Sequence, residues 1–211
     1  VQYSPTEEGY WKQDLAIVSN AGTHVVSVKA LCSKSYTVEV PVAGQFSSLV
    51  QDANSDSITI MGYLNESDFR FMKNNMPNLK YLNLSATSIT GNRIPNYALQ
   101  SKKTLREVVL PYTLKVVGYQ AFDQCSALQR IVFPEGLEQI EQEGFSECNI
   151  SGELVLPDSL VALGSGAFDV SPLTKIVFPD RLKEIGDWAF RSCTNLQDVT
   201  LPKNLERIGS S

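Results

Sequence analysis

The feature that most constrains the fold of this chain is a phrase of about 23 residues that recurs through its second half. Each copy contains an alternating apolar run, a proline and a second apolar run, and the first four close on a small residue followed by Phe. A fixed period in the twenties with apolar residues at fixed offsets predicts a solenoid of stacked coils. The repeat prolines stand at Pro111, Pro134, Pro157, Pro179 and Pro202, in steps of 23, 23, 22 and 23 residues.

The pattern within one copy predicts how a coil is built. The run Leu-x-x-Val-x-Leu alternates as a half-buried strand does, and the proline that follows ends the strand because it has no N–H to donate to a sheet. The second run returns the chain along the opposite side and carries its Phe into the interior. We therefore expect a mostly-β α/β solenoid whose interior holds one row of buried rings, at Phe122, Phe145, Phe168 and Phe190.

The chain upstream divides into degenerate repeats and a different region. Weaker copies begin near Ile58 and Leu79, so the repeats are predicted to occupy 58–211, with steps of 22–23 residues and an incomplete last copy. That copy stops where Ala-Phe should follow, which suggests that the chain was cut there or that a partner covers this end. Residues 1–57 are predicted to cap the solenoid.

Within this N-terminal half, local patterns predict three short elements. Val38, Val40 and Val42 alternate with polar residues or proline as in a short strand. Residues 45–52 and 65–74 are predicted to be short helices, the second with Asn65 as its N-cap.

The repeat resembles one known family. Phrases such as LTKIVFPDRLKEIGDWAFRSC and LQRIVFPEGLEQIEQEGFSEC are similar to the LPxxLxxIGxxAFxxC consensus of BspA-like leucine-rich repeats, which occur on the surface of anaerobic bacteria of the gut and mouth. The resemblance implies a right-handed solenoid with one parallel sheet on its concave face and irregular returns behind it. Two departures affect local loops: Glu141 replaces a repeat glycine, and the loop after Phe168 is one residue short.

Charge and hydropathy restrict the partners. The formal net charge is −5, which argues against nucleic acid or an anionic membrane as a ligand. No apolar run approaches the roughly 18 residues that a membrane-spanning helix needs, so no membrane span is expected. No signal segment stands at Val1, so the chain is either cytosolic or has lost its targeting segment. The resemblance favours an exported protein at the cell surface.

The candidates for chemistry are few. Cys125, Cys148 and Cys193 each follow a repeat Phe by three residues, which predicts buried thiols stacked in parallel and neither a disulfide nor a metal site. The single histidine, His24, lies far from these cysteines in the sequence. The stretch 52–56 imitates the start of a calcium loop but lacks the glycine and the closing glutamate, so a turn is the better interpretation. We therefore predict no catalytic residues, no metal and no cofactor.

Two columns on the predicted concave face are the candidate binding surface. At the fifth place of the strand run, four valines should form an apolar stripe, either because Val suits any sheet or because a ligand binds there. At the third place the charges alternate in sign, so neighbouring coils should attract each other. The apolar stripe is Val109, Val132, Val155 and Val177, and the polar column is Tyr81, Glu107, Arg130, Glu153 and Lys175, followed by Asp198.

A third column follows the prolines. Glu135, Asp158 and Asp180 should lie side by side along one edge, where they would suit a basic partner or a weakly held cation. The alternative is that Pro-Asp is a common turn sequence whose charge water screens.

These observations favour a non-catalytic extracellular module. The resemblance implies adhesion to, or recognition of, a host or matrix protein, here through the concave face. A cell-surface glycan is the alternative ligand, although the concave columns offer only Tyr81 for a sugar to stack on. A purely structural spacer is the third possibility.

Overall fold

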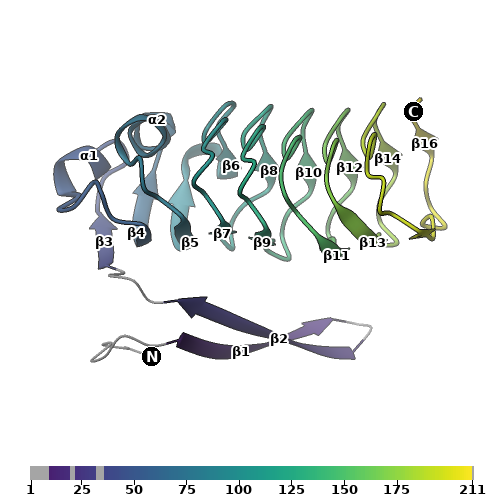
Figure 1. Ribbon diagram of the computed structural model, residues 1–211, viewed down its shortest axis with the longest axis horizontal. Coiled ribbons are helices and arrows are strands. Elements are labelled where there is room, and N and C mark those ends of the chain that lie inside the picture. The colour runs from purple at the N-terminus through teal and green to yellow at the C-terminus, as the bar shows by residue number, and fades with distance from the viewer. Residues whose placement is uncertain (1–9, 20–21, 32–35, 211) are drawn as a thin grey trace.

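A computed structural model describes residues 10–19, 22–31 and 36–210. From residue 36 onward the chain winds as a ladder of coils, one after another along the long axis of Figure 1. Each full coil has three sides: a strand, a return that carries a second short strand, and a side of turns. The predicted solenoid is confirmed.

The strand side forms two parallel sheets that follow each other along the solenoid. The first has the order β3-β4-β5-β7-β9 and the second β11-β13-β15. Their strands are β3 (Tyr36–Val40), β4 (Ser57–Leu64), β5 (Tyr81–Ile89), β7 (Glu107–Val109), β9 (Arg130–Val132), β11 (Gly152–Val155), β13 (Leu173–Val177) and β15 (Asp198–Val199).

The return side also carries a sheet, although irregular returns were expected there. Six strands of two residues pair in parallel in the order β16-β14-β12-β10-β8-β6, without interruption. They are β6 (Arg93–Ile94), β8 (Val116–Val117), β10 (Gln139–Ile140), β12 (Ala162–Leu163), β14 (Glu184–Ile185) and β16 (Arg207–Ile208). Runs this short show no alternation that a sequence pattern could reveal.

The turn side is held by main-chain hydrogen bonds between coils. Gln120 and Glu143 lie in left-handed conformations, with φ of 49° and 55°, and donate their N–H groups to the carbonyls of Gln142 and Ser165 at 3.0 and 2.8 Å. A left-handed non-glycine residue costs about 1–2 kcal/mol. Here the conformation recurs coil after coil because it aims the N–H at the next coil.

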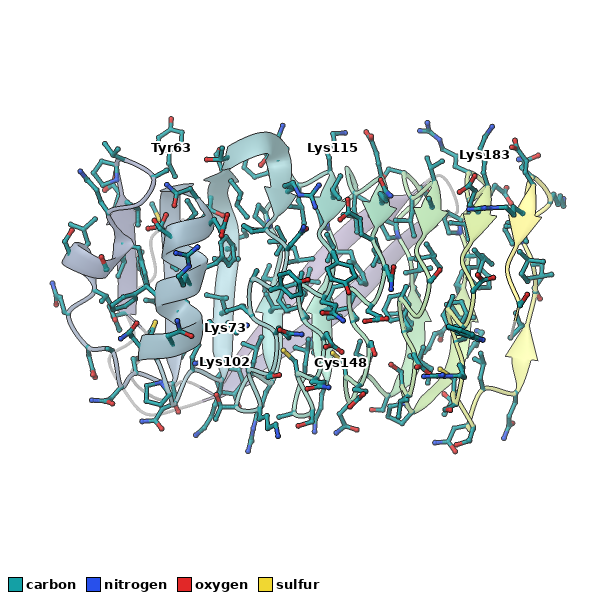
Figure 2. The ribbon with its side chains drawn as sticks, turned by 90° about the horizontal axis from the view of Figure 1, so that it is seen from above. Tyr63, Lys73, Lys102, Lys115, Cys148 and Lys183 are labelled. Atoms are coloured by element: carbon teal, nitrogen blue, oxygen red, sulfur yellow. The ribbon has the colours of Figure 1, made fainter. Side chains whose placement is uncertain are left out.

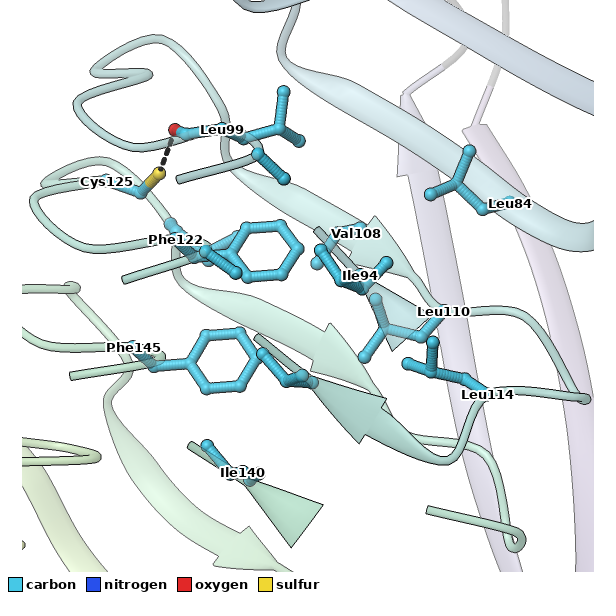
Figure 3. Close-up of a cluster of buried hydrophobic side chains, with 14 of the residues drawn as sticks. Leu84, Ile94, Leu99, Val108, Leu110, Leu114, Phe122, Cys125, Ile140 and Phe145 are labelled. Atoms are coloured by element: carbon cyan, nitrogen blue, oxygen red, sulfur yellow. Dashed lines mark hydrogen bonds between the residues drawn. The ribbon is translucent and has the colours of Figure 1, made fainter. Parts of the chain in front are cut away.

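The interior is filled by the predicted row of rings. Phe122, Phe145 and Phe168 are fully buried and stack nearly parallel, with ring centroids 5.0 and 5.6 Å apart. Phe190 continues the row at 5.9 Å but is only partly buried, because it lies near the end of the stack. Figure 3 shows Phe122 and Phe145 among the aliphatic side chains of neighbouring coils.

The strand side is interrupted between β9 and β11, which belong to different sheets. We call this boundary the seam. In the coils on either side a buried leucine stands just before the strand or at its first residue, as Leu128 and Leu173 do, but here Ser151 stands in that place and Ile150, one residue earlier, is buried instead. Gly152 then adopts a φ of +80°, and the register of β11 on β13 shifts beside it. The misplaced apolar residue thus accounts for the interrupted sheet.

The upstream part of the solenoid carries helices. Helix α1 is Phe46–Leu49 and helix α2 is Glu66–Asn75, where Asn65 is the N-cap as predicted and its side chain accepts from Ser67 N at 2.9 Å. The buried Asp68 carboxylate accepts main-chain N–H groups from Asn65, Gly44 and Phe46 at 2.7–3.0 Å. Asp68 therefore ties the start of α2 to the chain around α1. A short 3₁₀ helix, η1, occupies Thr90–Asn92.

Strand β3 pairs in parallel with β4, so the sheet extends upstream of residue 58. Val38 and Val40 lie in β3 with buried side chains, whereas Val42 is exposed beyond its end. Further upstream, β1 (Tyr10–Ser19) and β2 (Gly22–Leu31) form an antiparallel pair. The assignment of residues 1–57 as a capping domain stays a prediction.

Candidate interaction surface

The valine stripe lies on the outward side of the strands. In β11 and β13, Leu154 and Ile176 point inward and are buried, while Val155 and Val177 point outward with exposed fractions of 61% and 37%. Val109 and Val132 also point outward but are half-buried. We call this outward surface of the strand side the strand face.

The stripe consists of two pairs separated by the seam. Val109 lies opposite Val132 in the pairing of β7 with β9, and Val155 lies opposite Val177 in that of β11 with β13. No pairing joins Val132 to Val155, since β9 and β11 belong to different sheets. The sequence period placed the valines in one column but did not reveal this break.

The alternating charges occupy neighbouring positions within each sheet, but the seam separates Arg130 from Glu153, which were expected to be neighbours. Glu107 lies opposite Arg130, and Lys175 Nζ lies 2.8 Å from Glu153 Oε1. Burial raises the pKa of the Glu107 carboxyl, and the charge of Arg130 partly opposes this. Tyr81 pairs with Glu107 at the upstream end of the column. Exposed pairs of this kind contribute about 0–1 kcal/mol each, so the column sets register more than stability.

The acidic edge is exposed on consecutive coils. Glu135, Asp158 and Asp180 each follow the proline that ends a strand, and all three are exposed. Asp180 lines a depression of about 550 Å³ together with Lys203 and Arg181, so cationic side chains border the downstream end of the edge. Among the residues that the structure describes, no cluster of three or more His, Cys, Asp or Glu side chains could hold a metal ion.

The cysteine column is a row of thiol donors inside the turn side. Cys125 Sγ lies 3.1 Å from the carbonyl oxygen of Leu99, as Figure 3 shows, and Cys148 and Cys193 make the same contact with Phe122 and Phe168 at 3.2 Å. Burial raises the pKa of Cys125 to about 12 and raises those of the other two thiols as well. The thiols thus stay protonated and donate weak hydrogen bonds between coils. Cys32 lies outside the described residues.

Lys102 occupies the same column one coil upstream, in a role that the repeat pattern did not reveal. Its side chain is buried, and Nζ donates to the carbonyls of Lys73, at 3.0 Å, and Met76, at the C-terminal end of α2. Figure 2 shows Lys102 beside Lys73 at the end of the helix. Burial lowers the pKa of Lys102. This cation caps the helix and joins it to the first regular repeat.

Glu141 also has a role that the repeat pattern could not supply. Its carboxylate accepts from Arg93 Nη1 and Nη2 at 3.2 and 2.8 Å and from Tyr119 N at 3.0 Å. Arg93, Tyr119 and Glu141 belong to three successive coils, so the side chain that replaces glycine clamps all three. Loop geometry is maintained there by a charge-assisted hydrogen-bond network.

Exposed aromatic side chains lie on the turn side. Tyr97 and Trp188 are 47% and 52% exposed. The Tyr97 ring meets Tyr119 edge-on at 5.2 Å, and the Arg191 guanidinium lies 5.6 Å from the centroid of Trp188. From the sequence, only Tyr81 of the concave columns was considered for sugar stacking, and no role was given to Tyr97 or Trp188.

The stretch 52–56 forms a turn, in line with the interpretation of its sequence. Asp52 Oδ1 accepts from Asn54 N at 2.9 Å in a turn, and Asp56 pairs with Lys80 at 3.4 Å.

The last coil exposes Val199, Leu201 and Ile208, with exposed fractions of 47%, 49% and 59%. Within the described part of the chain, no helix has the length and apolarity required to cross a bilayer. His24 lies in β2, where the structure describes only the backbone.

Comparison with known proteins identifies the repeat. Residues 92–211 match the model of the BspA-type leucine-rich repeat region in six copies. No curated protein matches the chain.

Among solved structures, the leucine-rich repeat protein of T. pallidum is 31% identical over 56% of this chain and 62% of that chain, with a TM-score of 0.46. A leucine-rich repeat protein of Eubacterium ventriosum shares 17% identity over 68% of this chain and 38% of that one, with a TM-score of 0.56. The pneumococcal vaccine antigen PcpA shares 17% identity over 73% and 58%, with a TM-score of 0.38.

The chain therefore spans less than two thirds of the length of each of these proteins. The E. ventriosum structure supports the fold, and the family model covers more than half of the chain with the repeat phrase that builds its coils. The chain belongs to the family of BspA-type leucine-rich repeat proteins.

Proposed function

We propose that this chain is a non-catalytic binding module of the bacterial cell surface that recognises a protein ligand through its strand face. The observation that carries the proposal is the outward exposure of Val155 and Val177, which lie opposite each other on the neighbouring strands β11 and β13. Apolar side chains in such a position often mark an interaction site. The paired charges of Glu153 and Lys175 lie beside them and provide the polar border that interfaces commonly have.

The family supports this proposal at a coarser level. BspA-type repeats form scaffolds on which function resides in surface residues, so the ligand cannot be taken from the fold. We place the protein outside the cell, in keeping with the surface location of such repeat proteins. A host or matrix protein is the partner class that this location favours.

The test is capture of purified matrix glycoproteins on a sensor surface. The variant V155K/V177K puts two charges into the proposed interface and should reduce capture at least tenfold, because each charge would lose its water on binding. Its stability should change by no more than about 0.5 kcal/mol, since both side chains face solvent.

The matched control is S126K/Q139K, which adds the same charge at exposed positions outside the strand face. This control should capture the same proteins as the wild type. Unchanged capture by a folded V155K/V177K variant would show that the strand face is not the binding surface.

A cell-surface glycan is the second candidate, and the exposed rings of Tyr97 and Trp188 favour it. Sugar faces stack on such rings, and both lie on the turn side, away from the valine stripe. A glycan array distinguishes the two ligand classes. Binding that is lost in Y97A or W188A but kept in V155K/V177K would assign the turn side to glycans.

A further inference from the structure

The seam leaves one side chain partly exposed at a place that the coils on either side bury. Val108, Leu154 and Ile176 point inward and are buried, but Ile131, at the same place in β9, is partly exposed. Phe133, the next inward-facing residue, is partly exposed while its ring packs edge-on against Phe145 at 5.7 Å, as Phe178 does against Phe190 at the same place further along the solenoid. The inward side of β9 is therefore covered less completely than that of β7, β11 and β13.

The main chain along the seam also differs from that between the other neighbouring strands, because its strand edges are unpaired. β9 pairs with β7 on its upstream side, and β11 pairs with β13 on its downstream side. The two edges that face each other across the seam have no strand pairing in the described structure. Unpaired edges next to apolar side chains are the features that extended peptides recognise.

The charge beside the seam is negative. Glu135 and Asp158 follow the carboxyl ends of β9 and β11, and both are exposed. Unlike Glu153, which pairs with Lys175, neither carboxylate has an ion-pair partner among the described residues. A ligand lying along the seam would therefore meet partly exposed apolar side chains and two carboxylates that its own cations could pair with.

We infer that the seam between β9 and β11 binds an extended polypeptide segment whose apolar residues alternate with lysine or arginine. The inference rests on the proposed function and narrows its partner class. Apolar side chains of the segment would contact Ile131, Phe133 and Val155, and its cations would pair with Glu135 and Asp158.

The first experiment compares two ten-residue peptides by titration calorimetry, one of alternating Leu and Lys and one of alternating Leu and Glu. The Leu-Lys peptide should bind at least tenfold more tightly than the Leu-Glu peptide, and its affinity should fall with added salt. In E135Q/D158N this affinity should fall at least tenfold.

The matched control for charge is E138Q/E206Q. It removes the same two charges from exposed side chains that pair with Lys115 and Lys183, away from the strand face. It should change the affinity for the Leu-Lys peptide by less than twofold. An equal loss in both variants would show that the peptide responds only to net charge and would overturn the inference.

The second experiment closes the seam. The exchange I150S/S151L places leucine where Leu128 and Leu173 stand in the neighbouring coils. We expect slower amide exchange at residues 130–133 and 152–155 and at least a tenfold loss of peptide affinity. V155K, which leaves the backbone pattern intact, serves as the second variant should the exchanged chain not fold.

Three further outcomes would overturn the inference: equal binding of the two peptides, binding of neither, or self-association of the chain that V155K abolishes. These outcomes differ from failure of the proposed function. Suppose that neither peptide binds, while matrix proteins are captured and V155K/V177K abolishes this capture. The strand face would then remain the protein-binding surface, and the seam would be rejected as its peptide site.

Discussion

The strand side and the return side pass through the same coils but differ in continuity. The return side pairs its six short strands from β6 to β16 without a break, while the strand side, with longer strands, is divided at the seam. The Phe row crosses this point undisturbed, with Phe145 and Phe168 stacked 5.6 Å apart. Coil stacking therefore depends on the interior and the return side, which leaves the strand side free to vary.

The largest expected effect concerns the continuous interior. Phe145→Ala removes a fully buried ring that contacts Phe122, Phe133 and Phe168. The loss of burial and the remaining cavity should lower the free energy of unfolding by about 3–5 kcal/mol, measured by urea denaturation. Phe190→Ala is the matched variant and should cost less, because that ring is already partly exposed. Equal costs would contradict a stability that is concentrated in the interior.

The next largest effect concerns Lys102, which joins helix α2 to the first regular repeat at the upstream end of the cysteine column. Lys102→Met leaves the carbonyls of Lys73 and Met76 without their donor and should cost about 1.5–3 kcal/mol. Burial lowers the pKa of Lys102, so the folded protein holds this proton less tightly than the unfolded chain does. The contribution of Lys102 to stability should therefore rise with pH between its lowered pKa and the ordinary value of 10.5, so the stability difference between the wild type and Lys102→Met should grow over this window.

The smallest of these effects compares two glycines of one coil. Gly164, on the return side, lies so close to the backbone of Gln142 that a Cβ would overlap it, and Gly164→Ala should cost about 1–3 kcal/mol. Gly152, at the seam, has a φ of +80° and open space where a Cβ would stand, so Gly152→Ala should cost only the left-handed conformation, about 1–2 kcal/mol. Amide exchange in β10 and β12 should quicken in the first variant and stay unchanged in the second.

The sequence predicted the features that recur from coil to coil and missed the contacts that occur only once. The strand, the proline, the Phe row and the thiol column recur at a fixed offset, so several copies define each position. Asn65 was also predictable, because an N-cap is a local signal. By contrast, the partner of Glu141 is Arg93, 48 residues away, and the acceptors of Lys102 lie on a helix outside the repeat pattern. Such single long-range contacts leave no periodic trace.

The seam was only partly predictable from the sequence. Its cause is visible in the sequence, because Ile150-Ser151 departs from the leucine that stands at this place in the coils on either side. The pattern alone did not show whether the backbone would move to bury Ile150 or leave it exposed. The structure buries Ile150 and interrupts the sheet, so the departure changes the candidate site from one continuous stripe into two pairs of valines.

The thiol column has a consequence for chemical reactivity. Alkylating reagents attack the thiolate, and burial keeps Cys125, Cys148 and Cys193 protonated. Each sulfur thus becomes reactive only when its own coil opens. Cys148 lies among fully formed coils, whereas Cys193 lies close to the exposed last coil. The extent of alkylation at Cys193 relative to Cys148 therefore reports how far the coils have opened from the C-terminal side.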